Sequence, residues 1–308
     1  MKKRSPHFVN AISTVSAWYL LLVVTLLCAS CEKAFIDDDE PETPDTDDTR
    51  ISVSFNVTSY NVVPFSSPTR TTQQLSDVCT RISFALFDAS GNKVTSKNQT
   101  KSDSQFGTYS LSVQAGTYQL VVVAHSSTEG NATISSPSEI KFASNKLSDT
   151  FYHYQTLEIK ENASYDITLQ RAVAMFRLNI TDATPADVSQ MKFYYTGGSS
   201  TLDATTGAGC VNSKQTELRT VAASAHSGQA TYEVYTFPHA DGKKLTMKVT
   251  ALSATGEPLQ EQEYDNVPVV VNKITECTTP FFSGSATDAC ALTFSAETQW
   301  EGTLTYGN

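Results

Sequence analysis

The chain has 308 residues, and its 32 acidic side chains outnumber its 22 Lys and Arg side chains, which gives a formal net charge of −10 at pH 7. Residues 1–30 hold three of the basic side chains and no acidic one, so the rest of the chain carries a net charge of −13. Binding to nucleic-acid phosphates requires a basic surface. The composition therefore argues against a nucleic-acid-binding protein.

The first thirty residues have the pattern of an export signal. Lys2, Lys3 and Arg4 form a positive region, and residues 17–29 form an apolar core. An apolar run of thirteen residues is about 20 Å long as a helix, whereas a membrane-spanning helix needs roughly 20 residues. A permanent transmembrane anchor is therefore the weaker interpretation, and we assign residues 1–30 as a signal peptide.

The apolar run ends at residues 27–31 in the sequence LCASC, which resembles the lipobox of bacterial lipoproteins. In a lipobox, small residues such as Ala29 and Ser30 let a signal peptidase cut before a cysteine, which then carries acyl chains such as palmitate. The resemblance implies that Cys31 is the lipidated first residue of the mature protein. The sequence departs from the lipobox at Cys28, where Leu is preferred. An ordinary secretory signal followed by an unmodified cysteine is the alternative.

Residues 31–50 are predicted to form an acidic, disordered tether. Four acidic side chains stand in a row at residues 37–40, and Pro41 and Pro44 follow without any apolar periodicity. A calcium-binding loop is the alternative, but it needs a turn glycine and a distal Glu that this stretch lacks. Acidic residues soon after a lipidated cysteine also resemble the surface-export signal of Bacteroidetes lipoproteins, which implies the outer face of the outer membrane.

From residue 51 the sequence consists of short alternating runs separated by turn residues, which is the pattern of β-strands. The first run places Ile51, Val53, Phe55 and Val57 on one face, with Ser and Asn between them, and predicts one half-buried strand. Residues 118–124 are apolar on both faces and predict a central strand. Further runs lie at 82–86, 109–113, 157–159 and 165–169, and the last two are predicted to pair as a hairpin.

A second set of strands begins at Val173. Its runs cover residues 173–180, 191–195, 232–236, 245–251 and 267–271. No segment shows a 3.6-residue period over the length of a helix, so the predicted fold class is all-β. The stretch 196–213 is rich in Ser, Thr and Gly and is predicted to be a surface loop.

Residues 84–94 and 249–259 echo each other as a strand, a turn with Gly at the same offset, and a return strand. The 278 residues that follow the signal also exceed what one β-sandwich usually needs. We therefore predict two sandwich domains, an N-terminal one at 51–171 and a C-terminal one at 172–308.

The sequence contains no recognisable catalytic or metal-binding motif. His125, His153, His226 and His239 show no metal-ligand spacing, and there is no nucleophile elbow, P-loop or dinucleotide fingerprint. Two of the 32 acidic residues could converge as a glycosidase pair, but nothing singles out such a pair. We therefore predict a non-catalytic protein without a metal ion or a cofactor.

Four cysteines remain after the signal and the candidate lipidation site: Cys79, Cys210, Cys277 and Cys290. They allow three pairings, between which the sequence does not choose. Cys277 and Cys290 are thirteen residues apart, which suits a hairpin-sized loop in an oxidising compartment, so they form the candidate disulfide. Free buried thiols are the alternative.

Two segments resemble a known family. Residues 167–176 (ITLQRAVAMF) look like the Leu-x-Arg-x-x-Ala junction between the domains of Bacteroidales fimbrial subunits, with Arg171 as the arginine. Asn266 to Pro268 (NVP), then Asn272 to Thr275 (NKIT) and residues 281–284 (FFSG), resemble the C-terminal signature of the same FimB/Mfa-type fimbrial subunit family of fimbrillin-like lipoproteins. The chain departs from this pattern at residues 277–280, where a Gly usually precedes the aromatic pair.

The resemblance implies two tandem transthyretin-like, Greek-key β-sandwiches, lipoprotein export to the cell surface, and assembly with other fimbrial subunits into a pilus that contributes to cell adhesion through a host protein or glycan. Assembly in this family is by strand exchange: an N-terminal strand is released after a cut at an arginine, and a strand of another subunit fills its groove. The candidate removable strand is the run from Ile51 to Val57, and Arg70 is the candidate processing site. Arg50 is a poorer candidate, because a cut there leaves the strand attached.

Two other functions remain as alternatives. A glycan-binding surface lipoprotein would use exposed aromatic side chains such as Trp300, Tyr194 or Tyr195 as stacking platforms, although aromatic side chains of a β-sandwich more often lie in its core. A surface hydrolase has no supporting motif.

The lipobox generates a first prediction. Cys31→Ala removes the thiol that would carry the lipid, so the variant should accumulate as an uncut precursor without lipid. Metabolic labelling with an acyl analogue and N-terminal sequencing measure both properties. A variant that loses its signal and still partitions with membranes would refute the assignment.

Overall fold

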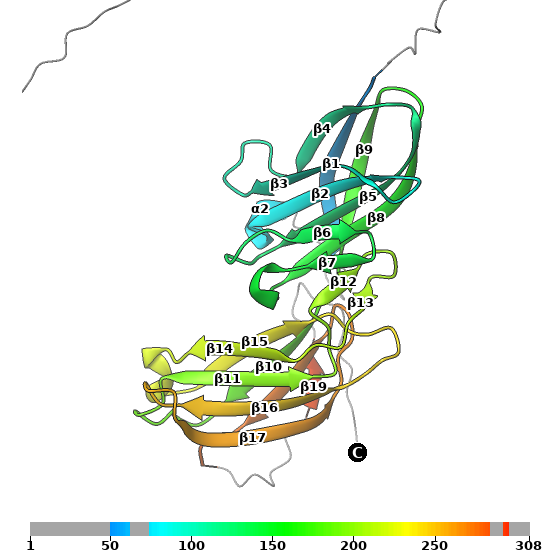
Figure 1. Cartoon of the computed structure of the whole chain (residues 1–308). Coiled ribbons are helices and arrows are strands. Elements are labelled where there is room, and N and C mark those ends of the chain that lie inside the picture. The colour runs from blue at the N-terminus through cyan, green and yellow to red at the C-terminus, as the bar shows by residue number, and fades with distance from the viewer. Residues whose placement is uncertain (1–49, 62–73, 284–291, 296–308) are drawn as a thin grey trace, which may run out of the picture. The chain divides into compact units, whose positions relative to one another are not determined.

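The computed structural model describes residues 50–61, 74–283 and 292–295 (Figure 1). The described chain is built almost wholly of strands, so the predicted all-β class is confirmed. Its helical pieces are one four-residue helix and two short 3₁₀ turns: α2 (Leu75–Val78), η1 (Ala143–Asn145) and η2 (Ala223–His226).

A seven-stranded sheet occupies the first half of the described chain. Its strand order is β3-β2-β5-β8-β9-β1-β4. The strands are β1 (Ile51–Asn61), β2 (Arg81–Asp88), β3 (Lys93–Thr100), β4 (Thr108–Val113), β5 (Gly116–His125), β8 (Thr150–Ile159) and β9 (Ala163–Arg171). Apolar side chains from both halves of this sheet, such as Phe84 and Leu120 from one half and Phe55 and Ile167 from the other, form one buried core.

The strand β5 is central, as its sequence predicts. It lies between β2 and β8, and residues 120–125 are all buried. Leu120, Val122 and Ala124 enter the core of the seven-stranded sheet, whereas Val121 and Val123 enter a second apolar cluster on its other face. Because both faces are covered, the run needs no polar alternation.

The predicted pairing of residues 157–159 with 165–169 is wrong. The strands β8 and β9 pair only at their far ends, where Phe151 lies opposite Arg171 and Tyr152 opposite Gln170. Over residues 163–170, β9 instead pairs in parallel with β1. Closeness in sequence favours a hairpin, but β8 and β9 share only this short ladder, and β9 forms its long ladder on its other edge, with the distant strand β1.

Two four-stranded sheets form the second half of the chain. One has the order β15-β10-β18-β19 and the other β14-β11-β16-β17. The strands are β10 (Ala174–Ile180), β11 (Gln190–Thr196), β14 (Gln215–Thr220), β15 (Ala230–Thr236), β16 (Leu245–Leu252), β17 (Pro258–Val267), β18 (Ile274–Thr279) and β19 (Leu292–Ser295). Phe176 and Leu178 of one sheet and Phe193 and Val249 of the other belong to a single core.

A small sheet corrects the prediction of a surface loop at 196–213. Its order is β13-β12-β7-β6, in which β12 (Thr201–Asp203) and β13 (Ala208–Gly209) join β6 (Thr133–Ser136) and β7 (Glu139–Lys141). Leu202 is fully buried. The small residues are required by close packing: a Cβ atom on Gly198 would lie 2.0 Å from Thr236 Oγ1.

The two echoing segments form equivalent hairpins, as predicted. Gly91 and Gly256 have φ angles of 82° and 85°, and their N–H groups donate to the carbonyls of Asp88 and Ser253 at 3.0 Å in each case. A positive φ is open to glycine without strain.

The cores separate near Arg171. One contains buried residues from Ile51 to Leu169, and another contains buried residues from Ala174 to Phe281. We propose the predicted boundary between residues 171 and 172 on this ground. The small sheet and the cluster that holds Val121, Val173 and Phe237 draw residues from both sides of it.

His125 gives a prediction about acid stability. Its side chain is 1% exposed, and burial, followed by the nearby charge of Arg81, lowers its pKa from 6.5 to about 4. Between pH 6.5 and 4 the unfolded chain therefore binds a proton at His125 that the folded chain does not bind. The contribution of neutral His125 to the free energy of unfolding is complete above pH 6.5 and is lost as the pH falls towards 4.

Denaturant unfolding of the wild type and of His125→Gln at pH 7 and pH 4 measures this effect. The wild type should lose about 3 kcal/mol more than the variant over this interval. Equal losses in the two proteins would contradict the prediction, because the other titrating groups are common to both.

Candidate functional site

The candidate removable strand, β1, lies inside its sheet. It pairs in parallel with β9 from Val53 to Asn61 and antiparallel with β4 from Ile51 to Asn56 (Figure 1). Its removal would therefore expose two strand edges at once, with their backbone N–H and C=O groups unpaired.

The inward face of β1 fills the core. Ile51, Val53 and Phe55 are buried, and the Phe55 ring lies 5.7 Å from that of Tyr165 on β9. The fourth predicted position differs, because Val57 is only half-buried and the register with β9 shifts between Val57 and Ser59. Three buried side chains at about 1.5–3 kcal/mol each give an upper estimate of about 5–9 kcal/mol for filling this groove.

The outward face of β1 is polar and makes hydrogen bonds with its neighbours. The Ser52 N–H donates to Asn162 Oδ1 at 2.8 Å, and Asn56 Nδ2 donates to Ser164 Oγ at 2.8 Å. A shift of the strand by one residue would break these bonds and would also bury the Ser and Asn side chains, so β1 has one favoured register.

The end of β1 contacts a buried arginine through an aromatic stack. The Tyr60 ring packs on Phe151 with 5.4 Å between centroids, and the Arg171 guanidinium lies 4.7 Å from the centre of the Phe151 ring. Arg171 is 3% exposed and donates two hydrogen bonds to Asp149, at 2.7 and 2.8 Å. Burial raises the pKa of Tyr60, which keeps its hydroxyl neutral.

Arg171 also joins the two segments that carry the family resemblance. Its Nη1 atom donates to Asn272 Oδ1 at 2.8 Å, and the Asn272 N–H donates to the Val173 carbonyl at 2.9 Å. Asn272 has a φ of 60°, a conformation that Asn adopts more readily than most residues. The arginine of the first segment and the asparagine of the second are therefore direct partners, which the sequence pattern did not reveal.

Several predicted site residues lie outside the described chain. They are Cys31, Arg70, Cys290 and Trp300. Cys277 is disulfide-bonded, whereas Cys79 and Cys210 are free thiols. Burial raises the pKa of the Cys79 thiol, so it is unreactive. The pairing of Cys277 with Cys290 stays a prediction.

Two of the three aromatic residues of the glycan-binding alternative lie in the described chain, and neither is an exposed platform. Tyr195 is 1% exposed and its hydroxyl donates to the Tyr235 carbonyl at 2.8 Å, and Tyr194 is half-buried. The large hydrophobic side chains that stand exposed in the described chain are aliphatic: Val94, Val211, Leu218, Leu259 and Val270.

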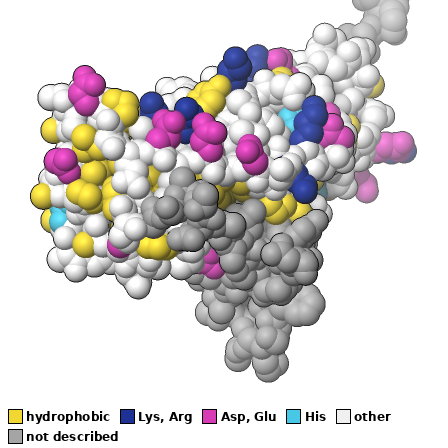
Figure 2. All heavy atoms as spheres, turned by 90° about the horizontal axis from the view of Figure 1, so that it is seen from below, with side chains coloured by type: hydrophobic (Ala, Val, Ile, Leu, Met, Phe, Trp, Pro, Cys, Tyr) yellow, Lys and Arg dark blue, Asp and Glu magenta, His cyan; other side chains and the backbone are white. Residues whose placement is uncertain are grey.

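Charged side chains are interspersed on the surface. Acidic and basic side chains lie close together on the face seen in Figure 2, and Lys248 pairs with Glu261 at 2.9 Å. Among the residues described, no three His, Cys, Asp or Glu side chains are placed to share a metal ion. The same residues, which leave out the apolar run at 17–29, include no helix of the length and hydrophobicity that a membrane span requires.

The model of one protein family, described as fimbrillin-A associated anchor proteins Mfa1 and Mfa2, matches residues 39–268. No curated protein matches the chain.

Solved structures resemble the chain at low sequence identity. A candidate adhesin from Bacteroides ovatus ATCC 8483 is 12% identical over 76% of this chain and 88% of its own, with a TM-score of 0.48. A candidate cell adhesion protein from the same strain is 12% identical over 82% and 98%, with a TM-score of 0.47. The fimbrial anchor protein Mfa2 from Porphyromonas gingivalis is 10% identical over 83% and 100%, with a TM-score of 0.42.

The packing of β1 gives a prediction. Phe55→Ala leaves a cavity in the first core and should lower the free energy of unfolding by about 3–5 kcal/mol. Ser52→Ala, on the exposed face of the same strand, is the matched control. It should change the free energy of unfolding by about 0.5 kcal/mol or less. Denaturant titration measures both, and similar small losses would show that β1 does not close the core.

Proposed function

We propose, from the premise that this chain belongs to the Mfa2 family of fimbrillin-A associated anchor proteins, that it is a surface subunit that accepts a strand from a neighbouring fimbrial subunit. Membership in this family makes the chain a fimbrial subunit. Strand exchange, the lipid anchor and a contribution to adhesion are the finer parts of the proposal. The proposed role is structural and requires neither catalysis nor a cofactor.

The observation that carries the proposal is the position of β1. The strand lies near the start of the folded region, is paired on both sides and fills the core with Ile51, Val53 and Phe55. Because β1 is the first strand of the described chain, a single backbone cut after it separates it from the strands that follow. Its release leaves β4 and β9 without the ladders that they form with β1. A released β1 leaves a groove of matching length between β4 and β9.

A donor strand would bind this groove as β1 does. Backbone hydrogen bonds to β4 and β9 would supply affinity, and alternate apolar side chains would enter the pockets that Ile51, Val53 and Phe55 occupy. The incoming strand must therefore carry apolar residues at every second position. Arg70 lies in the segment between β1 and α2, where a cut frees β1 from the rest of the fold.

The N-terminal sequence supports a location at the outer membrane. Cys31 as a lipidated residue would anchor the chain, and the residues from 31 to 50 would span at most about 70 Å when extended. A tether of this length would let other subunits reach the folded region.

Strand exchange can be tested with an arginine-specific protease and a synthetic peptide. Cleavage at Arg70 followed by dissociation of the segment before it should allow a labelled peptide of residues 51–61 to bind, because the peptide restores both ladders and refills three pockets. Arg70→Ala is the control for cleavage, and a peptide with Ser in place of Val53 and Phe55 is the control for the pockets.

Size-exclusion chromatography and fluorescence anisotropy give the readouts. The cut protein should bind the native peptide and should otherwise self-associate, whereas neither the Arg70→Ala protein nor the Ser-substituted peptide should support binding. A protein that has lost residues 51–70, yet stays monomeric, equally stable and unable to bind the peptide, would overturn the proposal.

A further inference from the structure

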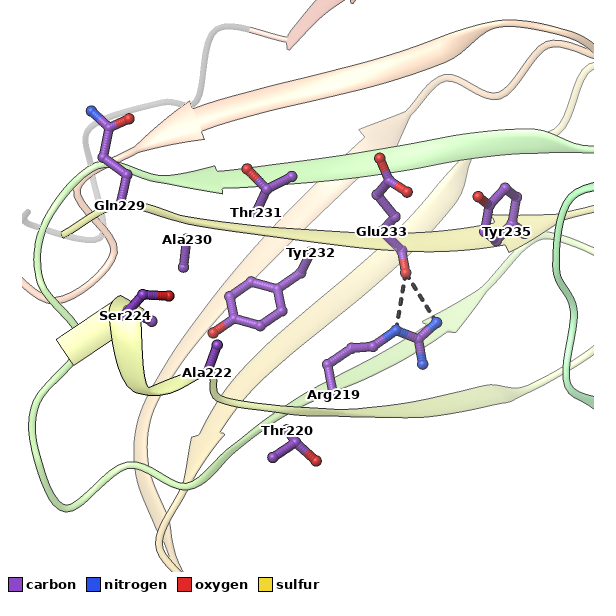
Figure 3. Close-up of a pocket in the computed structure, with 11 residues that line it drawn as sticks. Arg219, Thr220, Ala222, Ser224, Gln229, Ala230, Thr231, Tyr232, Glu233 and Tyr235 are labelled. Atoms are coloured by element: carbon purple, nitrogen blue, oxygen red, sulfur yellow. Dashed lines mark hydrogen bonds between the residues drawn. The ribbon is translucent and has the colours of Figure 1, made fainter. Parts of the chain in front are cut away.

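Two end strands face each other along one side of the second half of the chain. The strands β14 and β15 are each the last strand of their four-stranded sheet. A depression of about 510 Å³ lies between them and is lined by Arg219, Thr220, Tyr232 and Glu233 among other residues (Figure 3). We call this place the β14–β15 seam. End strands carry backbone groups that can pair with another chain.

Arg219 of β14 spans this seam. Its Nε and Nη2 atoms donate to the Glu233 carbonyl of β15 at 3.2 and 3.0 Å, and Figure 3 shows both bonds. Its Nη1 atom donates to the carbonyl of Leu218 at 3.1 Å and to Glu217 Oε2 at 2.9 Å. One guanidinium group therefore donates hydrogen bonds to backbone carbonyl groups of both end strands.

A second side chain occupies the next outward carbonyl of β15. Alternate residues of an end strand direct their backbone groups away from the sheet. Glu233 and Tyr235 are two residues apart, and the Tyr235 carbonyl accepts the hydroxyl of the buried Tyr195 at 2.8 Å. The two successive carbonyls that an added strand would use are thus already bonded to side chains of the opposite sheet.

The edge of β14 is occupied in the same alternating way. The Lys146 ammonium donates to the Thr216 carbonyl, and two residues later the Leu218 carbonyl accepts Arg219. Leu218 is 49% exposed, which makes this strand attractive to an apolar partner. The side-chain donors lie where the N–H groups of an added strand would have to bind.

We propose that Arg219 closes the β14–β15 seam to strand addition and thereby confines strand exchange to the groove of β1. This inference rests on the proposed function, because it identifies a residue that decides where a donor strand can bind. Arginine suits the task, since its planar fork bonds one carbonyl through two N–H groups and keeps its charge at every physiological pH.

The test uses the purified mature protein in an Arg70→Ala background, which keeps β1 in place. Arg219→Ala removes the guanidinium group that bonds both end strands and leaves the Glu233 and Leu218 carbonyls open. The labelled peptide of residues 51–61 is the probe. Binding should be roughly ten- to a hundredfold tighter than to the parent, or the variant should self-associate, because the lost bonds are charge-assisted.

Thr220→Ala is the matched control, since Thr220 neighbours Arg219 and lines the same depression but makes no bond across it among the described contacts. It should behave as the parent does. Arg219→Lys keeps the charge and the stem but not the two-pronged bond, and should give an intermediate affinity. This variant also serves if Arg219→Ala fails to fold.

Hydrogen exchange locates the new contact. Peptide binding or self-association should protect the amides of 215–220 or 230–236. A folded Arg219 variant that neither binds the peptide nor self-associates, or that shows protection only elsewhere, would overturn the inference. Because β1 stays in place throughout, failure of exchange at the β1 groove leaves this outcome unaffected.

Discussion

The constraint on which this structure depends is that every strand edge must have its backbone groups satisfied. In the seven-stranded sheet, Gln99 of the end strand β3 bonds across to the other end strand: its Nε2 atom donates to the Thr108 carbonyl at 2.6 Å, and its Oε1 atom accepts the Gly107 N–H at 2.9 Å. In the second half of the chain, Arg219 spans β14 and β15. The two halves use different residues to solve the same problem.

In the groove between β4 and β9, a whole strand, β1, pairs with the backbone groups of the two neighbouring strands. That solution buries more surface than a capping side chain does. Its strand, β1, is the first of the described chain, so its release cuts no loop between two other strands. Tyr60 adds a link from the end of this strand, through Phe151, to the Arg171 cluster. Any strand that replaces β1 meets the same Phe151 ring. The donor strand therefore needs a side chain that packs on this ring at its end, as well as apolar residues at alternate positions along its length.

Much of the fold could be predicted from local patterns. The alternation at 51–57 identifies β1, and glycine at the same offset in two segments identifies hairpins whose φ angles at Gly91 and Gly256 agree within a few degrees. The stretch 196–213 could not be predicted in this way, because Ser, Thr and Gly are as typical of loops as of tight packing. Gly209 shows the difference: a Cβ atom there would lie 2.4 Å from Ser199 Cβ, a contact between segments that only the folded chain brings together.

The capping residues were hidden from the sequence for a related reason. Gln99 and Arg219 are single polar residues in strands of mixed polarity, where such residues usually face solvent, and their role depends on which strand lies opposite. Arg171 was found through its neighbours in a short motif, but its partner Asn272 lies about a hundred residues away, and only the folded chain shows that the two side chains bond to each other. Sequence patterns therefore locate the strand that can leave, whereas the residues that keep the other edges closed emerge only from strand order.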